Sequence, residues 1–327
     1  MKTILTLWFL AIGSYPLFAQ TPLTIEGTVV NNKVTGWWDG VIIPRDVPAT
    51  LIYRNNSITS ANKEGYMLQA GEEGINNNNN HLDGALITGN KVMWTGTDLT
   101  CITHGLFTGC NINVSVLYNY LYKVPMGIIR KSVTGMANTS GGVAYNIIIS
   151  PNVGGVVKGM KNVNWYNNTF YQERSSSRPL IEIYTNDLAP TLPSTGCKVK
   201  NNIFYTKYQT LNVSVDGGSS SGFECDYNVY YCESGDPVFR FDGATKTWAQ
   251  WRALGYDAHS VIVNPGFINT TDLVPTVRLD YGTNLGTAWQ TGLSTTAVWV
   301  EGSSPTTANQ NGKWQAGARV FNVTGTY

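Results

Sequence analysis

The sequence is poor in charge, in histidine and in metal-binding cysteine motifs. Only 13% of the 327 residues are charged, whereas roughly 25% is usual in globular proteins. The formal net charge is +1 and no run of basic residues occurs, which argues against nucleic acid or an anionic membrane as a partner held by bulk electrostatics. No C-x-x-C pair is present and the three histidines are scattered, so a zinc site is not expected.

Long apolar runs are also missing after the first twenty residues. No later stretch reaches the roughly 18 apolar residues that a transmembrane helix needs. The first twenty residues have the order of a secretory signal peptide: the positive Lys2, an apolar stretch over residues 4–12, and the small Ala19 before Gln20. We expect residues 1–19 to be a signal peptide rather than a buried N-terminal strand. The mature protein, residues 20–327, would then be secreted, periplasmic or on the cell surface.

The five cysteines are an odd number for an exported protein. Export permits disulfides, but an odd count leaves at least one thiol unpaired. The pairs that lie close in sequence are Cys101 with Cys110 and Cys225 with Cys232. The sequence leaves the pairing open.

Helical periodicity over ten or more residues is hard to find, and short apolar segments between 34 glycines and 13 prolines take its place. These segments contain a repeat in which an asparagine stands two residues before an apolar residue. The successive asparagines are Asn56, Asn90, Asn119, Asn146, Asn168, Asn202 and Asn228, with spacings of 34, 29, 27, 22, 34 and 26. A second short apolar segment, opened by Gly or Pro, follows within the repeat.

Repeats of this kind predict an all-β, right-handed parallel β-helix. One turn cannot bury its own apolar face, but stacked turns bury a continuous core, and each strand pairs with the same strand one turn later. An asparagine at a bend tolerates a left-handed conformation, and stacked amides bond to one another as a ladder. We expect one domain of about seven or more turns. The alternative that the strand spacing permits is a pair of antiparallel β-sheets in a sandwich.

The ends of such a coil need covers, because open strand edges invite association. We expect the core over about residues 25–279 and a capping region over about residues 245–327 at the C-terminal end. Trp248 and Trp251 lie three residues apart in a segment that suits a short helix, so we interpret them as capping residues.

The rungs with Asn-Asn-x-[Ile/Phe] resemble the right-handed parallel β-helix proteins of the pectate-lyase-like superfamily. A second stretch is similar to the C-terminal end of bacterial β-helix repeat proteins: Trp248-x-x-Trp251, Gly255-Tyr256-Asp257, His259-Ser260 and Asn264-Pro265-Gly266-Phe267. The resemblance covers about residues 25–279 and implies the fold. The superfamily includes lyases, hydrolases, esterases, adhesins and phage tailspikes, so it does not fix the activity.

Alternation along the second segment of each repeat sorts its residues into two faces. We expect one set to face the core: Phe107, Ile129, Val157, Ile181, Leu211 and Phe239. We expect the neighbouring set to form an outward column: Thr108, Arg130, Lys158, Glu182, Asn212 and Arg240. Such a column also has a purely structural explanation, since it solvates the solenoid and alternating charges on adjacent strands stabilise a sheet.

Within this column, Arg130, Lys158 and Glu182 would suit a polysaccharide lyase. A lyase neutralises a uronate carboxylate with a cation and removes the proton α to it with a base. Lys158 is the expected base and Arg130 the expected cation. Glu182 would keep Lys158 protonated or help to hold a metal ion such as Ca²⁺, and no other cofactor is indicated.

Other residues are candidates for contact with a sugar. Asn212 and Arg240 belong to the column, His104 lies beside it, and Trp37 with Trp38 offer aromatic faces for stacking. A hydrolase is less favoured, because the chain has no Asp-Asp pair and the carboxylates around Asp226 are spread over one turn. Two function classes remain: a protein that binds, or binds and cleaves, an extracellular, acidic polysaccharide or cell-surface glycan, and a non-catalytic adhesion or display scaffold.

Overall fold

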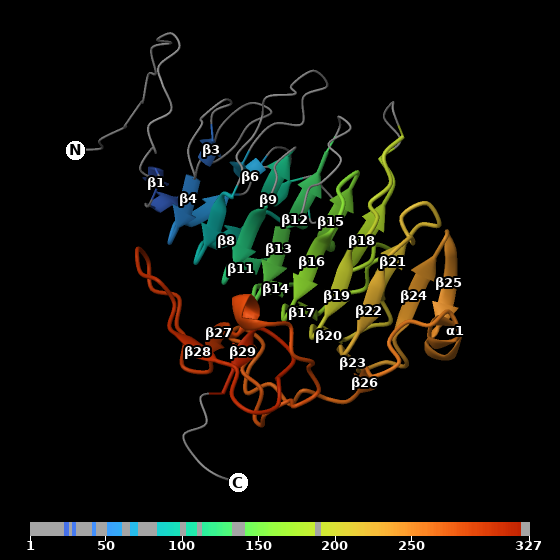
Figure 1. Cartoon of the computed structure of the whole chain (residues 1–327). Coiled ribbons are helices and arrows are strands. Elements are labelled where there is room, and N and C mark those ends of the chain that lie inside the picture. Colours follow the sequence, from blue (N-terminus) through green and yellow to red (C-terminus); the bar gives the residue numbers. More distant parts are fainter. Residues whose placement is uncertain are drawn as a thin grey trace, which may run out of the picture.

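The computed structural model describes residues 23–25, 28–30, 41–43, 51–60, 66–70, 84–98, 103–109, 113–132, 141–186 and 191–321. Three parallel sheets, here named A, B and C, run side by side along the molecule (Figure 1). Sheet A contains β1 (Leu23–Ile25), β4 (Leu51–Arg54), β7 (Leu86–Thr88), β10 (Val114–Leu117), β13 (Gly141–Ala144), β16 (Val163–Tyr166), β19 (Lys198–Lys200) and β22 (Glu224–Asp226).

The second strand of each turn belongs to sheet B and the third strand to sheet C. Sheet B contains β2 (Thr28–Val30), β5 (Ser57–Ser60), β8 (Lys91–Trp94), β11 (Tyr120–Tyr122), β14 (Ile147–Ile149), β17 (Thr169–Gln172), β20 (Ile203–Thr206), β23 (Val229–Cys232) and β26 (Val261–Ile262). Sheet C contains β3 (Val41–Ile43), β6 (Tyr66–Ala70), β9 (His104–Gly109), β12 (Met126–Lys131), β15 (Val153–Lys158), β18 (Ile181–Tyr184), β21 (Leu211–Val215), β24 (Val238–Phe241) and β25 (Ala244–Thr247).

The chain visits A, B and C in order, and each strand pairs in parallel with its counterpart one turn later. This is the topology of a parallel β-helix, so the predicted fold class is confirmed and the antiparallel sandwich is wrong. Within the three sheets, the described strands form one antiparallel pair, β24 with β25 at the C-terminal end. Among the described residues, no helix is long and apolar enough to cross a membrane.

The predicted asparagine ladder is confirmed from Asn56 to Asn228. The side-chain oxygen of Asn90 accepts hydrogen bonds from the backbone N–H of Asn56 (3.0 Å) and from its side-chain Nδ2 (2.8 Å). The same pair of bonds recurs at each step along the coil. Every ladder asparagine from Asn90 on also donates to a backbone carbonyl of the preceding turn. Buried amides are thereby satisfied throughout, which is what a buried polar row requires.

The residue before each ladder asparagine makes the turn between sheets A and B. It has a positive φ, between 53° and 66°, and the seven residues are Asn55, Gly89, Tyr118, Tyr145, Asn167, Asn201 and Tyr227. Asn and Gly tolerate this conformation, whereas a tyrosine rarely adopts it. Tyr118 and Tyr145 are held there by their hydroxyls, which donate to the backbone oxygens of Thr291 (2.8 Å) and Trp289 (2.5 Å).

Apolar side chains fill the interior of the coil. Phe170, Phe204 and Tyr230 occupy equivalent positions of sheet B on successive turns, with ring centroids 5.0 and 5.1 Å apart and nearly parallel planes. Trp94 and Trp165 are also fully buried in this core. The spacing of the rings follows the strand spacing of the sheet, about 4.8 Å.

A short helix covers the C-terminal end of the coil. Helix α1 (Trp248–Ala253) begins with a capping box between Thr247 and Gln250. Trp251 is fully buried and stacks on Phe239, with centroids 4.8 Å apart and planes 8° apart. Helix α1 thus packs against β24 and β25, the last strands of sheet C. It shields the last turn where no further strand of sheet C follows.

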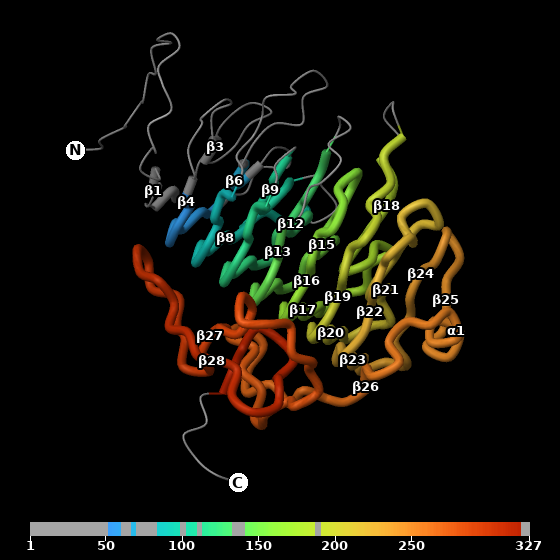
Figure 2. The backbone as a smooth tube through the Cα atoms, in the orientation of Figure 1, coloured from blue at the N-terminus to red at the C-terminus, as the bar shows by residue number. Residues whose placement is uncertain are grey.

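The rest of the predicted capping region lies elsewhere. Residues 263–321, here called the C-terminal arm, turn back and run along the flank of the coil toward its N-terminal end (Figure 2). The arm contains the 3₁₀ helix η1 (Thr287–Trp289) and a small sheet of β27 (Thr291–Ser294), β28 (Thr307–Asn309) and β29 (Arg319–Val320). It covers the outer face of sheet B rather than the end of the coil.

The arm is attached at the turn between sheets A and B. Side chains of the positive-φ row bond to it at several turns: Asn55 to Ser304 (3.0 Å), Asn167 to Gln315 (2.7 Å) and Asn201 to Thr283 (2.9 Å). Apolar residues of sheet B pack beneath it, among them Tyr120, Ile147, Ile149, Tyr171, Ile203 and Val229. The positive-φ residues thus form the bend between sheets A and B, and several of them also bind the arm.

Several sequence predictions concern residues that the structure does not describe or that it contradicts. The signal peptide, Trp37, Trp38, Cys101 and Cys110 lie outside the described residues. The suggested bond between Cys225 and Cys232 is wrong, because both thiols are free. Cys225 instead lies in the core, where its Sγ donates to Asp257 (3.2 Å).

Candidate functional site

The register of sheet C places a different row of side chains outside than the sequence alignment predicted. One row on the outer face of the sheet contains Phe107, Ile129 and Val156, which are buried, and then Glu182, Ser214 and Arg240. A second outward row contains Lys131, Lys158 and Tyr184. The predicted inward positions of Phe107 and Ile129 are wrong, since both belong to a small cluster separate from the core. Those of Val157, Ile181 and Phe239 are confirmed.

Arg130 is the main correction. Its side chain is fully buried, and Nη1 donates to the backbone oxygen of Val114 (2.8 Å). Thr108 and Val157 share its position in the register, so all three face the interior. Burial lowers the pKa of Arg130 to about 10. Arg130 therefore does not stand beside Lys158 on the outer surface, and the predicted column of Arg130, Lys158 and Glu182 is not formed.

Asn212 and His104 are also more enclosed than predicted. Asn212 is buried where the register between β21 and β24 shifts, and its amide donates to Val238 O (3.3 Å). His104 lies near Phe107, with ring centroids 5.8 Å apart. Burial lowers the pKa of His104 to about 4, so the ring is uncharged at neutral pH. Asn212 therefore supplies no exposed contact for a polymer, and the partly buried His104 supplies no charge.

Lys158, Glu182 and Arg240 do face outward. The ammonium group of Lys158 lies 5.1 Å from the ring centroid of Tyr184, the next residue of its row. Glu182 is in register with Ser214, and Ser214 with Arg240. These three predicted residues thus surround a short stretch of the outer face of sheet C, over β15, β18, β21 and β24.

A pocket of about 280 Å³ opens on this stretch. Its lining includes Arg178, Glu182, Tyr184, Ser214 and Asp216. Arg178 holds Glu182 in a two-pronged ion pair, with Nε to Oε1 at 3.1 Å and Nη2 to Oε2 at 2.5 Å. Such forked pairs fix both side chains in one orientation.

The second carboxylate of the pocket is fixed by the backbone. Asp216 Oδ2 accepts the N–H of Thr185 (2.6 Å) and Oδ1 accepts the N–H of Ser219 (2.7 Å). Asp242 repeats the arrangement one turn later, since its Oδ1 accepts the N–H of Gly217 (3.2 Å). The pocket thus has fixed hydrogen-bond donors and acceptors beside the ring of Tyr184.

These residues offer hydrogen bonds rather than metal ligation. Among the described residues, no group of three or more His, Cys, Asp or Glu side chains lies close enough together to hold a metal ion. The residues present on sheet C therefore do not fit the Ca²⁺ site that the lyase interpretation allowed. An oriented arginine, two carboxylates, a serine and a tyrosine offer both donors and acceptors of hydrogen bonds.

Sequence reasoning missed Arg178, Tyr184 and Asp216. Arg178 lies in the connection before β18, outside any repeat position, and only its spacing of four residues from Glu182 hinted at a pair. Tyr184 and Asp216 stand at the ends of their strands, beyond the segments that were aligned. Asp216 opens the segment Asp216-Gly217-Gly218, a turn signal that also marks a candidate backbone cap.

Comparison with known proteins adds no relative. No family model, no curated protein and no solved structure matches this chain. The function must therefore be argued from the site itself.

Proposed function

We propose that the protein is an exported, glycan-binding β-helix related to the pectate-lyase-like superfamily, and that the outer face of sheet C holds the sugar. The pocket lined by Arg178, Glu182, Tyr184, Ser214 and Asp216 carries the proposal. Its volume is just below the range of about 300–1,000 Å³ typical of small-molecule sites, which suits one sugar unit of a chain. Lys158 and Arg240 extend the polar surface on either side along the coil.

The charge of the pocket favours a neutral sugar over a uronate. Arg178 is neutralised by Glu182, and Asp216 adds a further negative charge. A uronate carboxylate placed there would meet like charge, whereas sugar hydroxyls can donate to Asp216 and accept from Arg178. The Tyr184 ring supplies an apolar surface beside these groups.

We propose that the protein binds the glycan without cleaving it. β-Elimination needs a cation at the substrate carboxylate together with a base. The cation assigned to that role, Arg130, is inside the coil, and Arg178 is engaged by Glu182. The non-catalytic scaffold is thus the better of the two function classes, with sheet C as its binding surface.

Arg178→Ala is expected to weaken glycan binding by about 10- to 100-fold, because a hydrogen bond to a charged group contributes about 1.5–3 kcal/mol. Tyr184→Ala, which removes the apolar ring surface, should weaken it by roughly two- to tenfold, since an aromatic contact contributes about 0.5–1.5 kcal/mol. Calorimetric titration of a panel of neutral and acidic oligosaccharides measures the loss. Asn164→Ala, on the outer face of sheet A, is the matched control and should bind like the wild type.

Two results would overturn the proposal. If both sheet C variants bind the glycan with wild-type affinity, the sugar does not bind to this face. A rise in absorbance near 235 nm on uronate polymers, lost in Lys158→Ala, would show a lyase and contradict binding without cleavage.

Export is the remaining part of the proposal, since extracellular glycans are reached only outside the cytoplasm. Residues 1–19 carry the order of a signal peptide. N-terminal sequencing of the secreted protein should start near Gln20. An intact Met1 on a cytoplasmic product would contradict export.

A further inference from the structure

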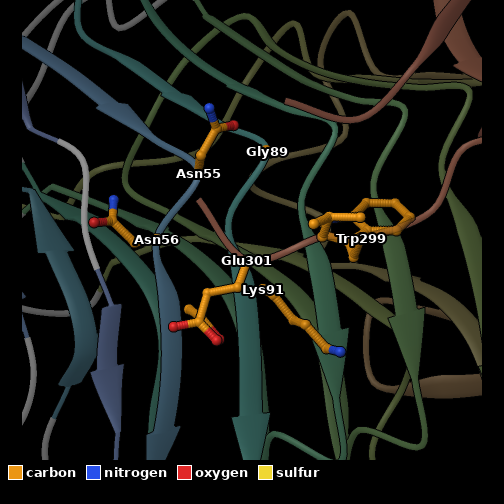
Figure 3. A pocket seen from close by; sticks show the side chains of 8 residues that line it. Asn55, Asn56, Gly89, Lys91, Trp299 and Glu301 are labelled. Carbon is orange, nitrogen blue, oxygen red and sulfur yellow. The ribbon is translucent and has the colours of Figure 1, made fainter. Parts of the chain in front are cut away.

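A second pocket lies on the other side of the coil, where the tip of the C-terminal arm meets the first described turns. Its volume is about 240 Å³. The coil contributes Asn55, Asn56, Ser57, Gly89 and Lys91, and the arm contributes Trp299, Val300 and Glu301. Figure 3 shows Asn55 and Trp299 on opposite sides of this space. More than 200 residues of sequence separate the two walls, so the pocket exists only when the arm is docked.

Both walls are fixed by contacts outside the pocket. The indole of Trp299 packs against Tyr120, with ring centroids 5.1 Å apart, and the guanidinium of Arg319 lies 5.4 Å from its centroid. The Nδ2 of Asn55 donates to Ser304 of the arm (3.0 Å). The pocket is therefore formed before any ligand arrives, which reduces the entropic cost of binding.

The pocket contains a buried polar atom that lacks a partner. Asn55 is only 7% exposed, and its Oδ1 accepts no hydrogen bond. A Cβ on Gly89 would lie 2.5 Å from this oxygen, so the glycine leaves the oxygen room. Buried acceptors are normally satisfied, so a ligand donor that reaches this oxygen after a small shift of the Asn55 side chain would remove the cost of leaving it unpaired.

The charged residues of the pocket balance one another without forming a pair. The charged ends of Lys91 and Glu301 point away from each other (Figure 3), and the ammonium of Lys91 lies 5.7 Å from the ring centroid of Tyr120. Together they provide a donor, an acceptor and no net charge. Ser57 adds a hydroxyl and Trp299 an aromatic surface.

We propose that this pocket is a second saccharide site, which binds one neutral sugar unit. Hydroxyl groups both donate and accept, so separate hydroxyls around one sugar ring can bond to the donors and acceptors of this pocket. The indole of Trp299 suits the apolar face of the ring. This site shares no residue with the pocket on sheet C, and the proposal holds whether or not sheet C binds a glycan.

The test is calorimetric titration of the full mature chain with neutral mono- and disaccharides, with uronates and with amino acids as comparison ligands. We expect saturable binding of a neutral sugar that persists in the double variant Arg178→Ala/Tyr184→Ala. Ser57→Tyr, which fills the pocket from the coil side, should weaken this binding at least tenfold. Ser303→Tyr, on the exposed arm tip outside the lining, is the matched control and should not change it.

Glu301→Gln provides a second variant that removes no packing contact, and it should also weaken binding at least tenfold. Full affinity in Ser57→Tyr or in Glu301→Gln would overturn the proposal. So would the absence of neutral-sugar binding in the double variant, or a preference for uronates or amino acids there. Loss of binding only in the sheet C variants would instead support the first site and refute the second.

Discussion

Replacing Asp257 with alanine is expected to lower the free energy of unfolding by about 3–4 kcal/mol, because several buried donors would lose their acceptor at once. Asp257 is fully buried at the end of the coil. Its Oδ1 accepts from Asn228 (3.0 Å) and Ser260 (2.5 Å), and its Oδ2 accepts from Trp251 (2.6 Å) and Tyr230 (3.0 Å).

The position of Asp257 explains why one carboxylate matters so much. Each ladder amide donates toward the C-terminal end of the coil, and Asn228 is the last of them. A carboxylate there accepts the final donor and also secures Trp251 of the capping helix. Asp257 therefore joins the ladder to the cap.

Urea denaturation followed by far-ultraviolet circular dichroism measures the effect. Asp236→Ala is the control, because that side chain is exposed and surface changes of this kind stay within about 0.5 kcal/mol. Equal unfolding midpoints for Asp257→Ala and the wild type would refute the role of Asp257 as the end of the ladder.

The coil and its ladder could be predicted from sequence because each turn repeats the same local requirement. An asparagine two residues before an apolar residue recurs at Asn56, Asn90 and onward, and the only arrangement that satisfies all these buried amides is a stack. The variable spacing did not hide the pattern, since extra residues enter the connections and leave the strands in register.

The faces of sheet C were harder to predict because Gly154 and Gly155 are adjacent, and either could be taken as the first residue of the strand segment. The structure pairs Ile128 with Gly155 and Arg130 with Val157, whereas the predicted columns place Arg130 beside Lys158 and therefore Gly127 beside Gly155. A slip of one residue exchanges the two faces of a strand. Arg130 was therefore assigned to the surface, although the register puts it inside with Thr108 and Val157.

No repeated sequence pattern predicts the arm or the two pockets. The arm has few regular elements, and its contacts with Asn55, Tyr118 and Asn201 join residues more than 80 positions apart. Tyrosine at a left-handed turn position is unusual, and at Tyr118 and Tyr145 the arm carbonyls hold the side chains in place. Contacts that depend on how the chain folds back after the last turn do not follow from a local repeat.

Truncation after Ile262, which removes the arm, is expected to make the chain self-associate. The arm covers Tyr120, Ile147, Ile149, Tyr171 and further apolar residues of sheet B. Monomeric proteins rarely expose a continuous apolar patch larger than about 300–600 Å², and a row of such side chains over several turns would form one. The truncated chain should bind a hydrophobic dye, elute early in gel filtration and melt at a lower temperature.

A point variant separates loss of the arm from loss of one of its bonds. Tyr118→Phe removes only the hydroxyl that donates to Thr291 O, so it should elute like the wild type and lose about 1 kcal/mol of stability. A truncated chain that does not self-associate, does not bind the dye and melts like the wild type would contradict a structural role for the arm. With the arm gone, the pocket between Asn55 and Trp299 loses one wall, so a soluble truncated chain should also lose the second saccharide site and keep the one on sheet C.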